Sequence, residues 1–298
     1  TIVHGICSVK SVKKTWRKES FFGLGDKTCG TNLRGKKYHN WCSDSFAFGR
    51  ETDENYRAIP FYLAYNQGLA YGIFLDNTFR SGFDFDSTET GKTSFGADGG
   101  ELNYYFFFEK NLTEVAKAYA MLTGRPELPP IWALGYHQSR WSYFPEKNVL
   151  ALAEEFRKQE IPCDAIYLDI DYMDGWRCFT VNEAHFPDLG SLTAALEAQH
   201  FKTVLMIDPG IKSDPNYPIF KEGLEKGHFL KKSDGQLALA PVWPGLCAFP
   251  DFTKKKVRLW WGELYRSLYE RKNVAGFWND MNEPALFVKD KTFPEQVQ

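Results

Sequence analysis

Three aspartates each stand at the end of a short apolar run, where an α/β protein places its chemistry. Asp169 ends the run 165–169, Asp208 follows the run 203–207, and Asp280 closes the run 276–280. If these runs are neighbouring parallel strands, their carboxyl ends deliver three carboxylates to one mouth. A structural sheet has no need of them, because a buried carboxylate costs several kcal/mol unless it is paired or hydrogen-bonded. The spacing therefore indicates a catalytic or binding site.

Aromatic side chains accompany these carboxylates, namely Trp141, Tyr172, Trp176, Trp243 and Trp278. Flat rings beside carboxylates suit a sugar, because its C–H faces stack on aromatic rings while its hydroxyl groups need acceptors. Glycoside hydrolysis typically uses two carboxylates around an oxocarbenium-like transition state. One carboxylate attacks or stabilises the anomeric carbon, and the other protonates the leaving oxygen. The combination predicts a site for a sugar.

The elements that must position these residues begin after Pro129-Pro130, where the pattern of the sequence changes. Strands are predicted at 132–138, 165–169, 203–207 and 276–280, and helices at 146–159, 189–199 and 253–271. This alternation is typical of a parallel sheet covered by helices, in either a doubly wound or a barrel form. Long acidic and aromatic loops (139–145, 171–188 and 208–250) favour the barrel. Because a (β/α)8 barrel has eight units, we expect about half of it to lie outside this chain.

Short alternating runs dominate before Pro129. Strands are predicted at 61–65, 71–75 and 102–108, and the turn residues between them are typical of an antiparallel β-sandwich. One helix is predicted over 112–123, with Asn111 as its cap and Gly124 at its end. We therefore predict two domains: a β-sandwich over residues 1–125, and the first half of a (β/α)8 TIM barrel over residues 126–298.

Composition argues against several other classes of protein. The 298 residues carry a net charge of −2, without a basic stripe, so nucleic acid is not an expected partner. No apolar stretch is long enough to span a bilayer, so no membrane contact is expected. No signal peptide is visible, and both ends look cut from a longer chain. We expect a soluble protein, and its compartment (cytoplasmic, periplasmic or secreted) stays open.

The sequence contains no motif that is typical of a metal site or a redox site. The six cysteines form no CxxC pair and the six histidines form no HExxH pair. We therefore predict no metal and no cofactor, and we favour buried free thiols over a disulfide framework.

At residues 276–284 the sequence Gly-Phe-Trp-Asn-Asp-Met-Asn-Glu-Pro resembles the nucleophile signature of glycoside hydrolase family 31, the α-glucosidase family. The resemblance implies that Asp280 is the nucleophile and that Trp278 and Met281 line a glucose pocket. Glu283 is then expected to orient its neighbours rather than to react. The bland alternative is that Asp280 caps a helix that opens at Pro284.

Further motifs extend the resemblance from about Phe21 to Phe287. It implies that Asp169 binds the distal hydroxyls of the sugar, that Trp243 is a pocket tryptophan, and that Met206 is an apolar wall.

Upstream, 22–26 and 40–44 resemble a loop of the family's N-terminal domain that reaches over the barrel, so that Asp44 would touch the substrate. The family's acid/base aspartate lies on the second half of the barrel, so the remaining half of its own barrel is an expected partner.

The function predicted from these features is that of a retaining, exo-acting α-glucosidase, which hydrolyses non-reducing terminal α-linked glucose from an oligosaccharide. Alone, without its acid/base half, the chain is expected to be nearly inactive. A transglycosylase with the same nucleophile and a non-catalytic carbohydrate-binding relative are the alternatives.

Several neighbours of the site have structural interpretations. Asp208, before Pro209, either holds the loop turn or belongs to the site. Trp141 and Trp176 either shape outer subsites or only pack. Structural roles are favoured for Asp171, for an Asp174–Arg177 pair and for the mid-helix Trp260 and Trp261.

Overall fold

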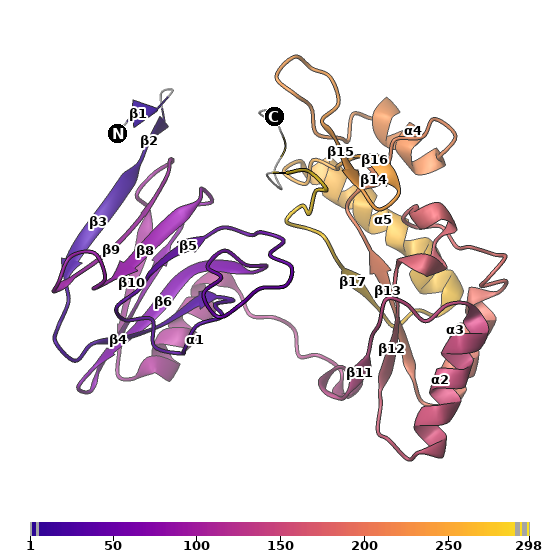
Figure 1. Cartoon of the computed structure of the whole chain (residues 1–298), viewed down its shortest axis with the longest axis horizontal. Coiled ribbons are helices and arrows are strands. Elements are labelled where there is room, and N and C mark those ends of the chain that lie inside the picture. Colours follow the sequence, from indigo (N-terminus) through magenta and orange to yellow (C-terminus); the bar gives the residue numbers. More distant parts are fainter. Residues whose placement is uncertain (1, 4–5, 290–292, 294–296, 298) are drawn as a thin grey trace. The chain divides into compact units, whose positions relative to one another are not determined.

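The computed structural model describes residues 2–3, 6–289, 293 and 297 (Figure 1). It divides into two compact units, Thr1–Glu127 and Leu128–Gln298.

The first unit is an antiparallel β-sandwich, as predicted. One sheet has the strand order β10-β7-β6-β4 and the other has the order β3-β9-β8-β5. The bounds of the first sheet are Tyr104–Glu109, Leu69–Leu75, Ala58–Asn66 and Ser20–Gly25; those of the second are Val9–Lys14, Lys92–Ala97, Ser81–Phe85 and Lys37–Asn40. A two-stranded sheet of β1 (Ile2–Val3) and β2 (Ile6–Cys7) precedes them.

Helix α1 (Leu112–Thr123) explains why strand β6 is aromatic on both faces. The ring of Phe61 stacks on Tyr119 of α1 with 3.9 Å between centroids. Tyr62 points the opposite way and is buried among the rings between the two sheets. Asn111 caps the helix as predicted, because its Oδ1 accepts a hydrogen bond from the Glu114 amide at 3.0 Å.

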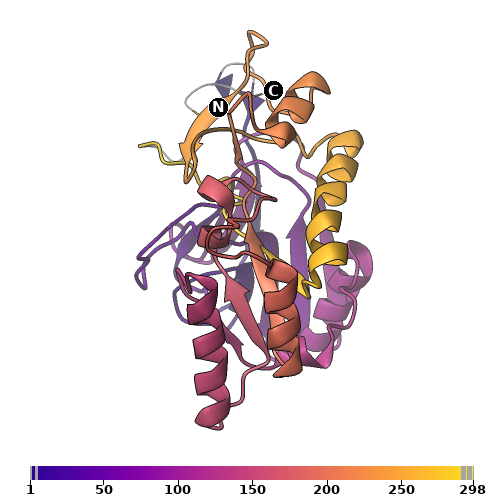
Figure 2. The same cartoon turned by 90° about the vertical axis from the view of Figure 1, so that its right-hand side faces the viewer.

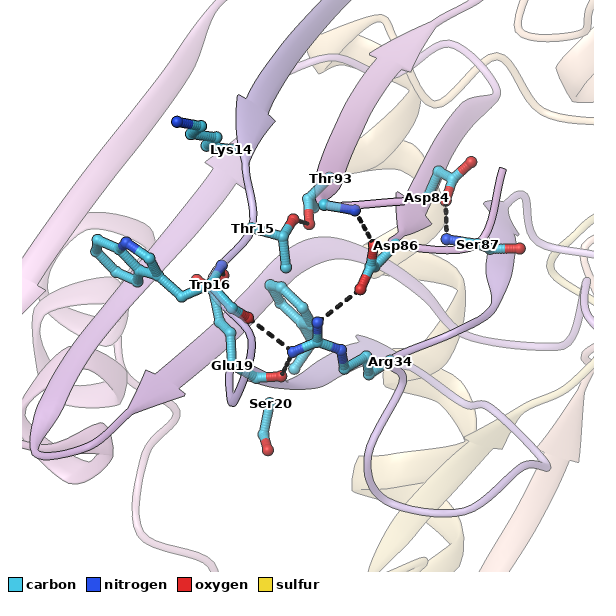
Figure 3. Close-up of polar contacts among 12 residues, drawn as sticks. Lys14, Thr15, Trp16, Glu19, Ser20, Arg34, Asp84, Asp86, Ser87 and Thr93 are labelled. Carbon is cyan, nitrogen blue, oxygen red and sulfur yellow. Dashed lines mark hydrogen bonds and ion pairs between the residues drawn. The ribbon is translucent and has the colours of Figure 1, made fainter. Parts of the chain in front are cut away.

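A polar network ties the β3–β4 turn to the body of the sandwich (Figure 3). Arg34 donates from Nη1 to the carbonyl oxygens of Trp16 and Glu19, both at 2.8 Å. Its Nη2 donates to the carboxylate of Asp86 at 2.6 Å. One guanidinium therefore joins three backbone segments through its planar fork of donors.

Glu19 is the buried centre of the same turn, with only 1% of its surface exposed. Its carboxylate accepts from the Trp16 amide at 2.9 Å, from the Lys13 ammonium at 3.2 Å and from the Tyr71 hydroxyl. Burial lowers the pKa of Lys13, and the charge of Glu19 opposes that shift. The buried charge is thus paired and hydrogen-bonded, as it must be to be tolerated.

The second unit contains a parallel sheet with the strand order β11-β12-β13-β17. The strands span His137–Gln138, Ala165–Leu168, Lys202–Ile207 and Gly276–Asn279. Their order in the sheet follows their order in the chain, without the reversal that defines a doubly wound sheet. The predicted partial (β/α)8 barrel is therefore confirmed, in preference to the doubly wound alternative.

Three long helices cover one face of this sheet: α2 (Glu146–Lys158), α3 (Leu189–Ala198) and α5 (Lys255–Lys272). Figure 2 shows them in front of the strands. Alternate strand residues share one apolar core with these helices, among them Ile166, Leu168, Leu205, Ile207, Val149, Leu192 and Val257. Trp260 and Trp261 of α5 belong to that core or pack against it, as predicted.

Two expectations for this unit are wrong. The predicted strand 132–138 begins instead as a 3-10 helix, Ile131–Leu134, and only β11 pairs with the sheet. The reason is local hydrogen bonding, because the Ala133 amide donates to the Pro130 carbonyl at 2.9 Å and the Gly135 amide to the Trp132 carbonyl at 3.2 Å.

The segment 208–250, expected to be a loop, folds into structure of its own. It holds helix α4 (Pro218–Glu225) and a sheet of order β14-β16-β15, with bounds Ile211–Lys212, Gly245–Ala248 and Leu239–Val242. Pro218 stands in the first turn of α4, where its missing amide hydrogen costs nothing. Shorter 3-10 turns, Ile170–Tyr172 and Asp174–Trp176, structure the loop after β12.

Five cysteines have free thiols: Cys29, Cys42, Cys163, Cys178 and Cys247. Cys163, Cys178 and Cys247 are buried, but Cys42 is exposed in the loop after β5, so the expectation of buried thiols is wrong there. Among the described residues, no helix combines the length and the apolar character needed to cross a membrane.

We expect Glu19→Ala to lower the free energy of unfolding by about 3 kcal/mol, because it leaves the Lys13 ammonium partly buried without its carboxylate. The measurement is urea unfolding at pH 7. Glu51→Ala is the matched control: it removes an exposed carboxylate that lies 3.2 Å from Lys36, and should cost less than about 1 kcal/mol. Equal costs for the two variants would contradict this assignment.

Candidate active site

The register of the parallel sheet places the predicted site residues on one face at its carboxyl end. Met206 of β13 pairs with Trp278 of β17. Leu168 of β12 pairs with Leu205, so the next residue, Asp169, is level with Met206. Asp208 and Asp280 lie two positions further along β13 and β17. Side chains two residues apart point to the same face of a strand. All five side chains therefore belong to the face that the long helices do not cover.

Asp169 is held by the turn that follows β12. Its Oδ1 accepts a hydrogen bond from the Ile170 amide at 2.7 Å, which opens the 3-10 turn 170–172. In the same turn, the buried Tyr172 hydroxyl donates to the Met206 carbonyl at 2.9 Å and so joins neighbouring strand ends. Burial raises the pKa of Asp169; the Ile170 amide opposes that rise, and the charge of Asp280 adds to it.

Asp280 sits where β17 turns sharply. Its amide donates to the Ile207 carbonyl at 3.1 Å, which continues the parallel ladder. Met281 adopts a φ of 58°, in the left-handed region that non-glycine residues rarely occupy. The Asn282 side-chain amide donates to the Asp280 carbonyl at 2.6 Å. No helix begins at Pro284 within the described stretch 281–289, so the helix-cap alternative for Asp280 is wrong.

Asp208 is the most buried of the three carboxylates, with 3% of its surface exposed. Its Oδ1 has no hydrogen-bond partner among the described residues. Burial raises the pKa of Asp208 to about 8, and the charges of Asp280, Asp169 and Glu283 act in the same direction. The carboxyl therefore shares one charged environment with Asp169 and Asp280. Sequence reasoning left this residue undecided between the turn and the site.

Trp243 stands in the two-residue turn between β15 and β16. Its ring lies 5.2 Å from Trp141, 6.3 Å from Trp176 and 4.8 Å from Phe287, measured between centroids. The loops after β11, β12, β13 and β17 thus bring four rings together. We call Trp141, Trp176, Trp243 and Phe287 the aromatic cluster.

Asp171 fixes two of the loops that carry this cluster. Its carboxylate accepts hydrogen bonds from the Trp176 indole at 2.9 Å and from the Ser142 hydroxyl, next to Trp141. The structural role predicted for Asp171 is consistent with these two bonds. The predicted pair of Asp174 and Arg177 is present as well, and Arg177 also lies 3.8 Å from Asp214.

His137 and Tyr167 were not singled out from the sequence, although they support the same face. The Tyr167 ring lies 6.2 Å from Trp278, and its hydroxyl lies 3.0 Å from Nδ1 of His137. Tyr167 precedes Asp169 by two residues, so strand alternation alone would have placed it on the site face. His137 carries no such signal, because its strand has only two residues.

Asp44 lies in the first unit, in the loop between β5 and β6, where its Oδ1 accepts a hydrogen bond from Tyr56 at 3.3 Å. Its predicted role at the sugar remains a prediction. Within the part of the chain that the structure describes, no group of three His, Cys, Asp or Glu side chains is arranged to hold a metal ion.

Comparison with known proteins agrees with this geometry. The model of the family 31 glycosyl hydrolase TIM-barrel domain matches residues 126–298, and that of the family's N-terminal galactose mutarotase-like domain matches residues 3–84. The chain belongs to glycoside hydrolase family 31. It is 43% identical to "Alpha-glucosidase 2" of Bacillus thermoamyloliquefaciens over 98% of this chain and 37% of that protein.

Another family 31 relative, the "Alpha-glucosidase" of Saccharolobus solfataricus, is 33% identical over 91% of this chain and 38% of its own length. The chain thus spans little more than a third of these curated relatives. Among solved structures, a family 31 dextranase of Flavobacterium johnsoniae in complex with isomaltotriose matches 95% of this chain and 34% of its own, with a TM-score of 0.89 and 37% identity. A glucosidase II alpha subunit matches with the same TM-score at 27% identity, over 97% of this chain and 34% of its own.

The raised pKa of Asp208 makes a stability prediction with a definite sign. Between about pH 4 and pH 8 the unfolded chain has released this proton while the folded chain retains it, so Asp208 makes stability fall as pH rises, by about 1.4 kcal/mol per unit. Asp208→Asn removes that slope. We therefore expect the variant to gain stability relative to the unsubstituted protein as pH rises from about 4 to 8, measured by urea unfolding.

Asp251→Asn is the control of opposite sign. Burial alone would raise the pKa of Asp251, but its bonds to Lys254 and Thr253 outweigh burial and lower it. Asp251 therefore stabilises the fold at pH values above the pKa that its carboxyl has in the unfolded chain. The stability lost in Asp251→Asn should become smaller only as the pH falls below that value. A stability difference for Asp208→Asn that is constant from pH 4 to pH 8 would contradict the assignment.

Proposed function

We propose that this chain is the first part of a retaining, exo-acting α-glucosidase that removes terminal α-linked glucose from the non-reducing end of oligosaccharides. The observation that carries the proposal is the arrangement of Asp169 and Asp280 on one face, at the carboxyl ends of the parallel strands β12 and β17, which lie on either side of β13. Barrel enzymes place their catalytic groups at this end of the strands.

Asp280 is the proposed nucleophile, which attacks the anomeric carbon and forms a covalent glycosyl-enzyme. In retaining enzymes a second carboxyl about 5–5.5 Å away protonates the leaving oxygen and then activates water. We assign that second group to the remaining half of the barrel, because this sheet holds four parallel strands and β17 stands at its edge. The activity thus belongs to the complete barrel.

The other predicted residues shape the glucose pocket in this proposal. Asp169 accepts the distal hydroxyls, so that binding energy orients the sugar for attack. Met206 and Trp278, which share a row across the sheet, supply the apolar floor, and Met281 lies directly beside the nucleophile. Trp243 lines the pocket, and Glu283 orients its neighbours. No cofactor is required for this reaction.

The names of the relatives support α-linked glucose as the donor. The solved structures include a dextranase with isomaltotriose and a glucosidase II alpha subunit in its alpha3-Glc2-bound form. Those two proteins share a glucose unit in their ligands while their names denote different activities. The common part of the site is thus expected to recognise glucose, and the aromatic cluster at the loops is the region from which the preference for the rest of the oligosaccharide would come.

We expect Asp280→Ala in the complete enzyme to lower the release of p-nitrophenol from p-nitrophenyl α-glucoside by about three orders of magnitude or more. Added azide or formate should restore part of the turnover, because a small anion can occupy the space of the lost carboxylate and attack in its place. Asp174→Asn, which alters an aspartate paired with Arg177 outside the proposed pocket, is the control and should stay within a few-fold of the unsubstituted enzyme.

An Asp280→Ala variant that kept most of its activity would overturn the nucleophile assignment. Turnover of p-nitrophenyl α-xyloside in preference to the glucoside would overturn the donor assignment. Longer oligosaccharides appearing at high substrate concentration would change the assignment from hydrolysis to glucosyl transfer.

A further inference from the structure

Asp208 occupies a position in the barrel unit that the proposed reaction does not yet use. It follows β13, the strand that lies between β12 with Asp169 and β17 with Asp280. The register pairs Ile207 with Asn279, so Asp208 is in line with Asp280 at the next position. Neighbouring strands lie about 4.8 Å apart, which brings the two side chains of one row within reach of each other.

The side chain is buried and incompletely bonded. Asp208 has 3% of its surface exposed, and its Oδ1 finds no partner in the part of the chain that the structure describes. It thus differs from the buried loop residue Asp251, whose carboxylate is bonded to Thr253 and Lys254. A charged carboxylate in such a place costs several kcal/mol, whereas a neutral carboxylic acid costs far less and carries a donor.

Among the described residues, the groups that shift the pKa of Asp208 by their charge are acidic. Carboxylates act on it from the strand ends and from the turn after β17, namely Asp169, Asp280 and Glu283. The thiols of Cys178 and Cys247 and the hydroxyl of Tyr172 face it from the loop after β12 and from β16. The Cys178 thiol donates to the backbone carbonyl of Asp208 at 3.2 Å and not to its carboxyl oxygens. The cation on this side is Lys212 of β14, which pairs with Cys247 across the small sheet and lowers the pKa of that thiol.

We propose that Asp208 is a positioning residue for the nucleophile: it stays a neutral carboxylic acid and donates a hydrogen bond to the carboxylate of Asp280. This inference rests on the proposed function, because it concerns the same site. A hydrogen bond from a neutral acid to a carboxylate is charge-assisted and therefore strong.

Two effects follow for Asp280. A donated hydrogen bond favours the charged form of the acceptor, so it keeps the nucleophile ionised at lower pH. It also fixes the orientation of the carboxylate toward the anomeric carbon. The burial and charges that raise the pKa of Asp208 to about 8 agree with a proton held at neutral pH. Above that pH, loss of the proton removes the donor and places two repelling carboxylates side by side.

The test is the pH profile of kcat/KM in the complete enzyme with α-glucosyl fluoride. Fluoride leaves without protonation, so the general acid does not impose the alkaline limb. We expect the unsubstituted enzyme to lose activity around pH 8. Asp208→Asn, whose amide keeps a neutral donor, should retain the acid limb and lose the alkaline one. Asp208→Ala should lower kcat/KM about 10- to 100-fold and move the acid limb to higher pH.

Asp251→Asn is the matched control, because Asp251 is a buried aspartate of the same segment between β13 and α5, and its profile should overlay that of the unsubstituted enzyme. If Asp208 had only a structural role, its substitution would lower kcat/KM by the same factor at every pH. Profiles of the same shape in all variants would therefore overturn the inference. Failure of the unsubstituted enzyme to turn over any α-glucoside would overturn the proposed function instead.

A second measurement needs no variant. Carbon-13 spectra of aspartate- and glutamate-labelled enzyme should contain at least two carboxyls that release their protons above about pH 6, the general acid and Asp208. A spectrum with none or only one would overturn the inference, even if Asp208→Asn did not fold.

Discussion

Mutual repulsion of carboxylates at three adjacent strand ends is the constraint on which the barrel unit depends. Asp169, Asp208 and Asp280 are brought to one edge by the parallel register, and burial and like charge raise the pKa of Asp169 and Asp208. A sheet tolerates such a cluster only when its surroundings are rigid enough to hold the charges in place. Because repulsion between the carboxylates raises the pKa of some of them, one carboxylate can remain charged while a neighbour keeps its proton.

The surrounding structure supplies that rigidity from the opposite face. Alternate residues of β12 and β13 share an apolar core with α2, α3 and α5, so the strands cannot shift without opening it. Hydrogen bonds then join the strand ends, from the Tyr172 hydroxyl to the Met206 carbonyl and from the Cys178 thiol to the Asp208 carbonyl. The core and these backbone bonds hold the strand ends in place, and the strand ends in turn position the aspartates.

Above the carboxylates, the loops are organised by polar contacts rather than by a sheet. Asp171 holds Trp176 and the segment beside Trp141, and the turn between β15 and β16 brings Trp243 to both rings. Trp141 remains 60% exposed although it packs against Trp243. In barrel enzymes, loops that differ above a common set of strand ends let one fold serve several substrates.

Local patterns in the sequence determined the positions of several helices and strands. Strand alternation and helix periodicity placed α1 with its Asn111 cap and the strands that end at Asp169, Asp208 and Asp280, because these signals lie within a few residues. The 3-10 turn at 131–134, the small sheet within 208–250 and the exposure of Cys42 were missed. The 3-10 turn is set by local hydrogen bonds that a strand-like run of apolar residues does not reveal, whereas the small sheet and the exposure of Cys42 depend on tertiary contacts. The environment of Asp208 is the clearest case. Its identity is visible in the sequence, but only the neighbouring strands make it buried, surrounded by acids and short of a hydrogen-bond partner, because a pKa is set by contacts in space.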